Sequence, residues 1–270
     1  MKVFDFNIHL PSIYVGENIN STIKRDLTLD STGIVEGLKS HIAAIKHVDK
    51  VNFQLFNTCL FDNEVSDFIQ TAKSYSLEYT LTALTDFRRP DFHKYLLRAK
   101  AQGVQAIMFN SYIQHIATAD FEQVLMVCKS AEELGMTICV DGSYGTAKMF
   151  EYENIKLACY LADRISRSPI VIVHSGGYNV LQAMLLALDK PNVWLDTSFS
   201  LPYYIGSSLE IDFAFAFKKM DYKRVVFGSD NPYMNIDVCV QIHQTFFEKY
   251  NFPASAIEDI FYNNAKLLFK

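Results

Sequence analysis

The amino-acid sequence predicts an α/β protein folded as a (β/α)8 (TIM) barrel, with residues 1–270 forming a single domain. Eight short apolar segments alternate with segments of helical spacing, and no Pro-, Gly- or Ser-rich linker divides the chain. Several apolar segments, such as PIVIVH and RVVFGSD, are continuous runs, which are typical of strands buried on both faces. Eight such repeats over roughly 250 residues match a (β/α)8 barrel. An open doubly wound sheet is the alternative, but no GxGxxG or GxxxxGK[ST] loop follows the first strand.

The strand segments are expected at residues 2–8, 51–56, 78–84, 103–109, 136–141, 170–174, 193–197 and 224–228. Helices are expected between them where apolar residues recur at three- and four-residue spacing. Four such stripes are Ile34/Leu38/Ile42/Ile45, Val65/Phe68/Ile69/Ala72, Phe121/Val124/Leu125/Cys128 and Ile155/Ala158/Leu161/Ile165. Residues 11–30 lack periodicity and are expected to form a long loop over the barrel mouth. Residues 254–270 predict an extra amphipathic helix that packs outside the barrel.

The composition excludes several classes of protein. The chain has 25 Lys+Arg against 30 Asp+Glu, a formal net charge of −5, which argues against a general nucleic-acid binder. No apolar run reaches the roughly 18 residues of a membrane span, and the amino-terminal segment lacks the apolar core of a signal peptide. Five cysteines without a CxxC pair indicate reduced thiols. We therefore expect a cytoplasmic protein.

The ends of the predicted strands hold the residues most suited to chemistry. The first strand ends in DFNIH, where alternation places Asp5, Asn7 and His9 on the same side. Later strands end at Asp141, His174 and Asp230. In a barrel, the carboxyl ends of the strands meet at one rim, and catalytic residues come from these ends. Imidazole and carboxylate groups are also the ligands of catalytic metal ions.

The motifs DxNxH, HSGG, LDTS, FGSDNPY and YNNAKLLF, in this order, resemble the amidohydrolase superfamily. More narrowly, the chain resembles its amidohydrolase-2 branch of metal-dependent hydrolases, which includes lactonases and decarboxylases. The ligand positions are degenerate. The resemblance implies His-x-His at the first strand, where this chain has Asn7 and His9. A bridging lysine of two-metal members is replaced by Met108, and a metal-binding histidine of strand five is replaced by Asp141.

The resemblance therefore implies a mononuclear site in which His9, Asp141 and Asp230 bind one divalent ion, with Asn7 as a weak amide-oxygen ligand. Such an oxygen-rich set favours Mn²⁺ or Zn²⁺, although a site without any metal is the other option. On the family pattern, Asp230 also takes a proton from the bound water, and His174 polarises the substrate or orients that water.

Structural alternatives exist for each residue. His9 is also compatible with a core histidine bonded to a backbone carbonyl, Asn7 with a hydrogen-bonding filler, and His174 and Asp230 with helix caps. Asp141 has two equal interpretations, a replacement ligand or an ion-pair partner of Lys148. Asp5 is expected to lie too deep to bind a ligand and to form hydrogen bonds within the barrel.

The substrate is expected to be a small molecule. The loops after strands four and five supply residues that could contact it, namely Asn110, Tyr112, His115 and Tyr144. The leading hypothesis is hydrolysis of an amide, lactone or related C–N or C–O bond. A non-oxidative decarboxylase is the second hypothesis, favoured if an arginine such as Arg25, Arg88 or Arg89 reaches the mouth. The third is a non-catalytic relative that binds a ligand or partner. A homo-oligomer is compatible with the sequence.

Overall fold

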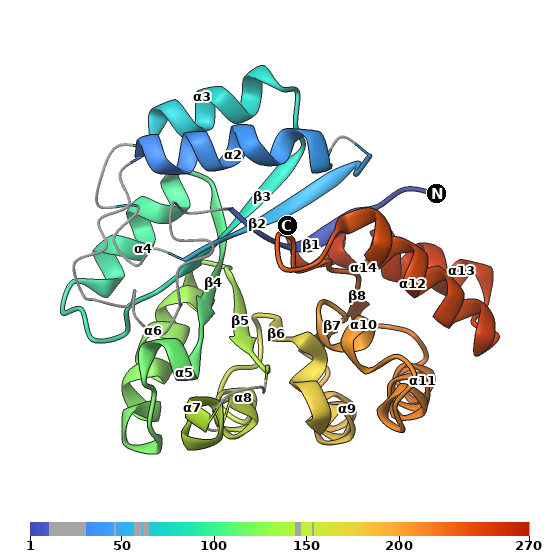
Figure 1. Cartoon of the computed structure of the whole chain (residues 1–270). Coiled ribbons are helices and arrows are strands. Elements are labelled where there is room, and N and C mark those ends of the chain that lie inside the picture. Colours follow the sequence, from blue (N-terminus) through green and yellow to red (C-terminus); the bar gives the residue numbers. More distant parts are fainter. Residues whose placement is uncertain are drawn as a thin grey trace.

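The computed structural model describes residues 1–10, 31–45, 47–56, 61, 65–143, 147–152 and 154–269. Eight parallel strands pair in sequence order, and Figure 1 shows helices surrounding them. The strands are β1 (Phe4–His9), β2 (Lys50–Leu55), β3 (Tyr79–Leu84), β4 (Val104–Phe109), β5 (Thr137–Asp141), β6 (Ile170–Val173), β7 (Val193–Asp196) and β8 (Val225–Val226). No strand extends more than one residue beyond its expected segment. The predicted TIM barrel is confirmed.

The barrel closes between its first and last strands. Asp230, just after β8, donates its backbone N–H to the Asn7 carbonyl of β1 (2.8 Å), and His9 donates its own to the Asn231 carbonyl (2.8 Å). A bridge between Ile8 and Asn231 joins the same segments. These bonds rule out the open doubly wound sheet, because they connect the two strands that an open sheet leaves as edges.

Helices follow the strands in the expected alternation, and the four predicted stripes lie on α2, α3, α6 and α8 or directly beside them. The longer helices are α2 (Ser31–Ile45), α3 (Ser66–Ser74), α4 (Phe92–Ala101), α6 (Phe121–Glu133), α8 (Asn154–Ala162), α9 (Val180–Asp189), α11 (Leu209–Lys219) and α12 (Ile236–Lys249). Shorter helical segments are α5 (Ser111–Gln114), η2 (Thr118–Asp120), α7 (Ala147–Glu151), η3 (His174–Asn179), α10 (Ser200–Tyr204), α13 (Ala254–Glu258), η4 (Asp259–Asn263) and α14 (Asn264–Leu268).

The carboxyl-terminal tail reaches the inside of the barrel. The barrel interior contains Phe4, Phe6 and Trp194, and the Phe269 ring stacks on Phe6 with 5.8 Å between ring centroids. Thr137, the first residue of β5, donates its hydroxyl to the Leu268 carbonyl (2.6 Å). The sequence predicted only a helix packed outside the barrel. The tail does more than this, because its last residues cover the amino-terminal end of the strands.

Two further expectations concern the predicted loop at residues 11–30 and the cysteines, which were expected to be reduced thiols. Residues 11–30, predicted as a loop over the mouth, lie outside the described residues. Cys128, Cys139, Cys159 and Cys239 are free thiols, whereas Cys59 is also outside the described part. Among the described helices, none combines the length and the hydropathy that crossing a bilayer requires.

Candidate functional site

The carboxyl ends of four strands bring together the four titratable residues that the sequence singled out. His9 Nε2 lies 2.8 Å from Asp230 Oδ1. His174 Nε2 lies 3.6 Å from Asp141 Oδ2 and 4.0 Å from Asp230 Oδ1. All four side chains are buried. The barrel thus places two imidazoles and two carboxylates in one cluster, which we call the His9–Asp230 network.

Asn7 joins this network from β1. Its amide nitrogen donates to Ser198 Oγ (2.8 Å) and to Asp230 Oδ1 (3.3 Å). Its amide oxygen is buried and has no hydrogen-bond partner within the part of the chain that the structure describes. The amide group therefore presents hydrogens, and not its oxygen, to the Asp230 carboxylate.

Asp5 does not share the direction that strict alternation predicted for β1. The register with β2 shifts between Asp5 and Ile8, so alternation is interrupted there. Asp5 Oδ1 accepts the backbone N–H of Ser229 (2.9 Å) and of Asn7 (3.1 Å), which confirms hydrogen bonding within the barrel. Burial raises the pKa of Asp5 to about 7.

Asp196, the last residue of β7, fixes the loop that holds His174. Its fully buried carboxylate accepts the backbone N–H of His174 (3.1 Å) and of Ser198 (3.1 Å), as well as the Ser198 hydroxyl. His174 Nδ1 in turn donates to the Ser198 carbonyl (3.1 Å). The other ring nitrogen, Nε2, faces the carboxylates of Asp141 and Asp230.

The backbone at the site adopts conformations that side chains disfavour. The φ angles of His174, Ser175 and Asp230 are 60°, 51° and 65°. Non-glycine residues in this region cost on the order of 1–3 kcal/mol each, and they concentrate at functional sites. Gly228 is required for packing beneath them, since a Cβ there would overlap the Asp196 carboxylate. This explains the glycine of the FGSDNPY motif.

Two pKa shifts follow from the proximity of these charges. For His174, burial alone would lower the pKa, but the charge of Asp230 and the hydrogen bond and charge of Asp141 raise it to about 10. For Asp141, burial would raise the pKa, but His174 and the bonds from Ser143 outweigh burial and hold it below its usual value. His174 is therefore an imidazolium at neutral pH, placed between two carboxylates.

Comparison with known proteins gives the family. A family model described as Amidohydrolase (Amidohydro_2) matches residues 79–270, well over half of the chain. The chain belongs to the amidohydrolase family. Comparison with curated protein sequences finds no significant match.

Solved structures share the fold of this amidohydrolase at low sequence identity. An uncharacterized TIM-barrel protein from Bordetella bronchiseptica is 17% identical (TM-score 0.72; 99% of this chain, 98% of that chain). A probable 2-pyrone-4,6-dicarboxylic acid hydrolase from Acinetobacter baumannii, with citric acid bound, is 15% identical (TM-score 0.66; 100% of this chain, 99% of that chain). An amidohydrolase from Burkholderia multivorans with bound zinc is 11% identical (TM-score 0.68; 99% of this chain, 99% of that chain). Others are a 2,6-dihydroxybenzoate decarboxylase and a 4-oxalomesaconate hydratase, both 13% identical. Hydrolases, a decarboxylase and a hydratase thus share this fold.

The donor set of this amidohydrolase does not fit the divalent ion that the sequence predicted. His9, Asp141, Asp230 and Asn7 were the expected ligands, yet within the described ranges no three His, Cys, Asp or Glu side chains form a group able to hold a metal. The reason lies in the hydrogen bonds. Asn7 donates to Asp230, His9 is bonded to the same oxygen, and His174 faces both carboxylates with a protonated nitrogen. A metal ion needs free lone pairs, whereas the carboxylate oxygens of Asp141 and Asp230 already face the hydrogens of their imidazole and amide neighbours.

Two of the predicted substrate-contact residues lie at the network. Asn110 donates its amide to Asp141 Oδ2 (3.0 Å) and accepts the Ile113 N–H (3.0 Å), which caps α5. Tyr112, next to Asn110 in the chain, is half-buried. Burial, with the charge of Asp141, raises the pKa of its phenol. Asp141 is thus held by Asn110, Ser143 and His174, and the side chain of Lys148 is outside the described part.

Of the other two predicted contacts, one lies away from the network and one is outside the described residues. His115 is exposed at the end of α5, where its φ of 52° ends the helix and its ring stacks on Tyr152 (5.3 Å). It therefore lies at the rim, with no contact to the His9–Asp230 network. Tyr144 lies outside the described residues.

Gln54 is a candidate that the sequence analysis missed. It is 1% exposed, yet among the described residues neither its amide nitrogen nor its amide oxygen has a hydrogen-bond partner. It pairs in register with His9, and Phe56, two residues further on, packs its ring on the His9 ring (4.6 Å). Asn52, two residues earlier on the same face, is fully bonded to neighbouring strands. The signal was present, because Asn52 and Gln54 are polar at alternate positions of an apolar strand.

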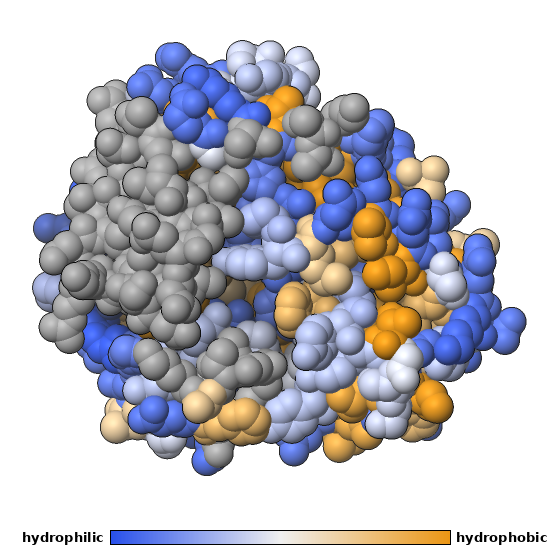
Figure 2. Space-filling view, viewed as in Figure 1, coloured by the Kyte–Doolittle hydropathy of each residue, from blue (hydrophilic) through white to orange (hydrophobic). Residues whose placement is uncertain are grey.

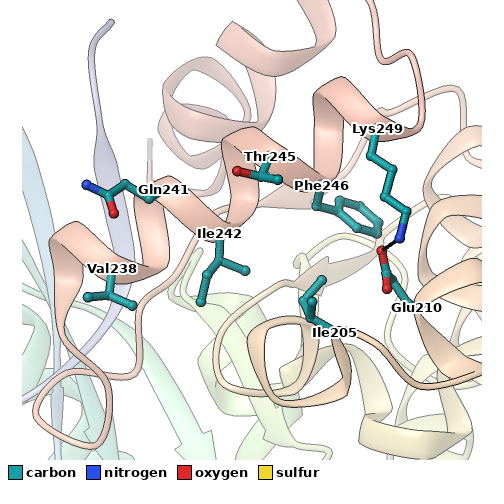
Figure 3. Close-up of a pocket in the computed structure, with 8 residues that line it drawn as sticks. All are labelled: Ile205, Glu210, Val238, Gln241, Ile242, Thr245, Phe246 and Lys249. Carbon is teal, nitrogen blue, oxygen red and sulfur yellow. Dashed lines mark hydrogen bonds and ion pairs between the residues drawn. The ribbon is translucent and has the colours of Figure 1, made fainter.

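A separate pocket lies outside the barrel. Its volume is about 360 Å³. Figure 3 shows its lining residues, among them Ile205, Val238 and Ile242, between α12 and the α10–α11 segment. At one end Lys249 forms an ion pair with the buried Glu210 (2.7 Å) and lowers the pKa of that carboxyl. No residue of the His9–Asp230 network lines this pocket.

Proposed function

We propose that this amidohydrolase hydrolyses a C–O or C–N bond of a small-molecule lactone, ester or amide. The supporting observation is the position of Asp230 Oδ1, 2.8 Å from His9 Nε2 and 4.0 Å from His174 Nε2. A carboxylate beside a protonated imidazole combines a base with a donor for developing negative charge. Acyl-group hydrolysis needs this pair of functions.

In the proposed reaction, Asp230 accepts a proton from water while the water oxygen bonds to the substrate carbonyl carbon. The carbonyl π electrons move to its oxygen, and the His174 imidazolium stabilises the resulting charge. When the carbonyl re-forms, the C–O or C–N bond breaks and the leaving group takes the proton from Asp230. His9 and Asn7 hold the Asp230 carboxylate in position.

No step in this proposal passes through a metal ion, since the donors do not fit one. We expect purified protein to hydrolyse a member of a panel comprising 2-pyrone-4,6-dicarboxylate, aryl esters and N-acyl amides. Dialysis against a chelator should leave the rate within about two-fold. Absorbance assays measure the rate of hydrolysis before and after dialysis, and elemental analysis measures the metal content of the protein. Loss of activity on chelation with recovery in Zn²⁺ or Mn²⁺ would show instead the metal-dependent hydrolase that the sequence suggested.

The two candidate arginines that the structure describes, Arg88 and Arg89, favour hydrolysis over decarboxylation. A decarboxylase needs a cation for the substrate carboxylate. Arg88 donates to the carbonyls of Gln114 (2.9 Å) and His115 (3.0 Å), and Arg89 is paired with Asp91 (2.8 Å). Arg25 lies outside the described residues. Release of CO₂ from 2,6-dihydroxybenzoate would reverse this preference. Thermal stabilisation by panel compounds without turnover of any would indicate the non-catalytic relative.

Gln54 is proposed to bind a polar group of the substrate, because its buried amide has no hydrogen-bond partner among the described residues. Gln54→Leu should raise the melting temperature by about 2–4 °C, since it removes unpaired buried groups. It should also lower kcat/KM about ten-fold for the panel substrate that is hydrolysed. Asn52→Leu is the matched control and should destabilise, because it breaks four hydrogen bonds. A Gln54→Leu protein that is less stable and fully active would contradict this role.

A further inference from the structure

The outer side of α9 is apolar, unlike that of an ordinary surface helix. Its sequence is VLQAMLLALD, in which only Gln182 and Asp189 are polar. Leu181, Leu185 and Leu188 recur at helical spacing and are exposed. A helix that is apolar all round is normally covered on every side. One side of α9 is covered by the barrel, so the other side lacks a cover within the described part of the chain.

The neighbouring helix α11 extends this surface. Ile211 and Phe215, four residues apart, are exposed on α11, which packs against α9. We call the five residues Leu181, Leu185, Leu188, Ile211 and Phe215 the α9–α11 face; they are between 37% and 62% exposed. Figure 2 shows hydrophobic surface gathered at the lower right, over α9 to α12. The face presents on the order of 500 Å², near the upper end for the largest patch of a monomer.

We propose that a second copy of this chain covers the α9–α11 face, related by a two-fold axis. Tyr178 and Tyr203, exposed on the segments that precede and adjoin α9 and α11, bring the apolar surface to roughly 750 Å². A stable dimer buries about 800 Å² per partner. The apolar area alone thus approaches this value before any polar rim is counted, and an apolar stripe is self-complementary, as a two-fold interface requires.

The charges on α11 fit the same arrangement. The first turn holds Asp212 and the last turn holds Lys218 and Lys219. In an antiparallel pair of α11 helices, Asp212 of each copy faces the partner's Lys219, at both ends of the interface. Glu210, also in the first turn, is already paired with Lys249. Charge complementarity therefore favours a second copy over an unrelated apolar ligand.

Light scattering after gel filtration tests the proposal and does not depend on any enzymatic activity. We expect the full-length protein to have twice the mass of the 30.8-kDa chain, and Leu185→Glu and Ile211→Glu to give monomers with unchanged circular dichroism. Leu97→Glu, an exposed leucine on α4, is the matched control and should remain dimeric.

A charge reversal tests the orientation. Asp212→Lys should weaken dimerisation about ten-fold, and adding Lys219→Asp should restore it. The proposal is overturned if the wild-type protein is monomeric up to about 100 μM. It is also overturned if Leu185→Glu stays dimeric, if Leu97→Glu dissociates equally, or if the double charge variant is no tighter than Asp212→Lys.

Discussion

The Asp230→Asn protein should lose about three orders of magnitude in kcat/KM while keeping its fold. An amide cannot accept the proton of the attacking water. The carboxylate of Asp230 only accepts hydrogen bonds, from His9 and Asn7, whereas an asparagine amide also carries hydrogens that would face the hydrogens of these neighbours. Because proton transfer occurs in the transition state, kcat should fall much more than KM changes. The measurement uses whichever panel substrate the wild-type protein hydrolyses.

Asp237→Asn is the matched control for Asp230→Asn. It makes the same chemical change at an exposed position in the first turn of α12, and activity should stay within about two-fold of wild type. Melting temperatures of the two variants separate a catalytic loss from unfolding. An Asp230→Asn protein that keeps a third or more of the wild-type activity would remove Asp230 from the proposed mechanism.

The strands could be predicted because their local signal agrees with their environment. Runs such as PIVIVH are apolar on both sides, and the β6 residues Ile170–Val173 are buried on both faces of the sheet. The register shift in β1 could not be predicted, since it depends on a partner more than 200 residues away. Ser229, after β8, donates to Asp5, and this contact is invisible in a local pattern. The end of the carboxyl-terminal tail was placed incompletely for the same reason, because its apolar face does not say which surface it covers.

At the site, the residues could be predicted but their mutual roles could not. Barrel geometry alone brings the strand ends at His9, Asp141, His174 and Asp230 together. Whether these groups bind a cation or one another depends on which nitrogen carries a hydrogen. For His174, the Ser198 carbonyl accepts the hydrogen of Nδ1, and the charges of Asp141 and Asp230 keep the facing Nε2 protonated as well. Gln54 was missed because its importance lies in the hydrogen bonds it does not make, which only a structure reveals.

The Asp196→Ala protein should lose about 3–5 kcal/mol of its free energy of unfolding. Asp196 accepts two backbone N–H groups, from His174 and Ser198, and it is wholly buried. Without the carboxylate these donors stay buried and unpaired, each costing about 1–3 kcal/mol. The His174 loop also contains residues with positive φ, so it depends on these bonds to keep its shape. Urea unfolding followed by circular dichroism measures the loss.

Two further variants separate the loss of hydrogen bonds from a general effect of the substitution. Asp196→Asn keeps one acceptor oxygen and the side-chain volume, and should lose roughly half as much stability. Asp163→Ala removes an exposed carboxylate and should change stability by less than about 0.5 kcal/mol. Since Asp196 positions His174, Asp196→Asn should lower kcat more than it raises KM, even where the protein is fully folded. A destabilised Asp196→Asn protein with unchanged kcat would mean that the bonds to Asp196 support the barrel and not the placement of His174.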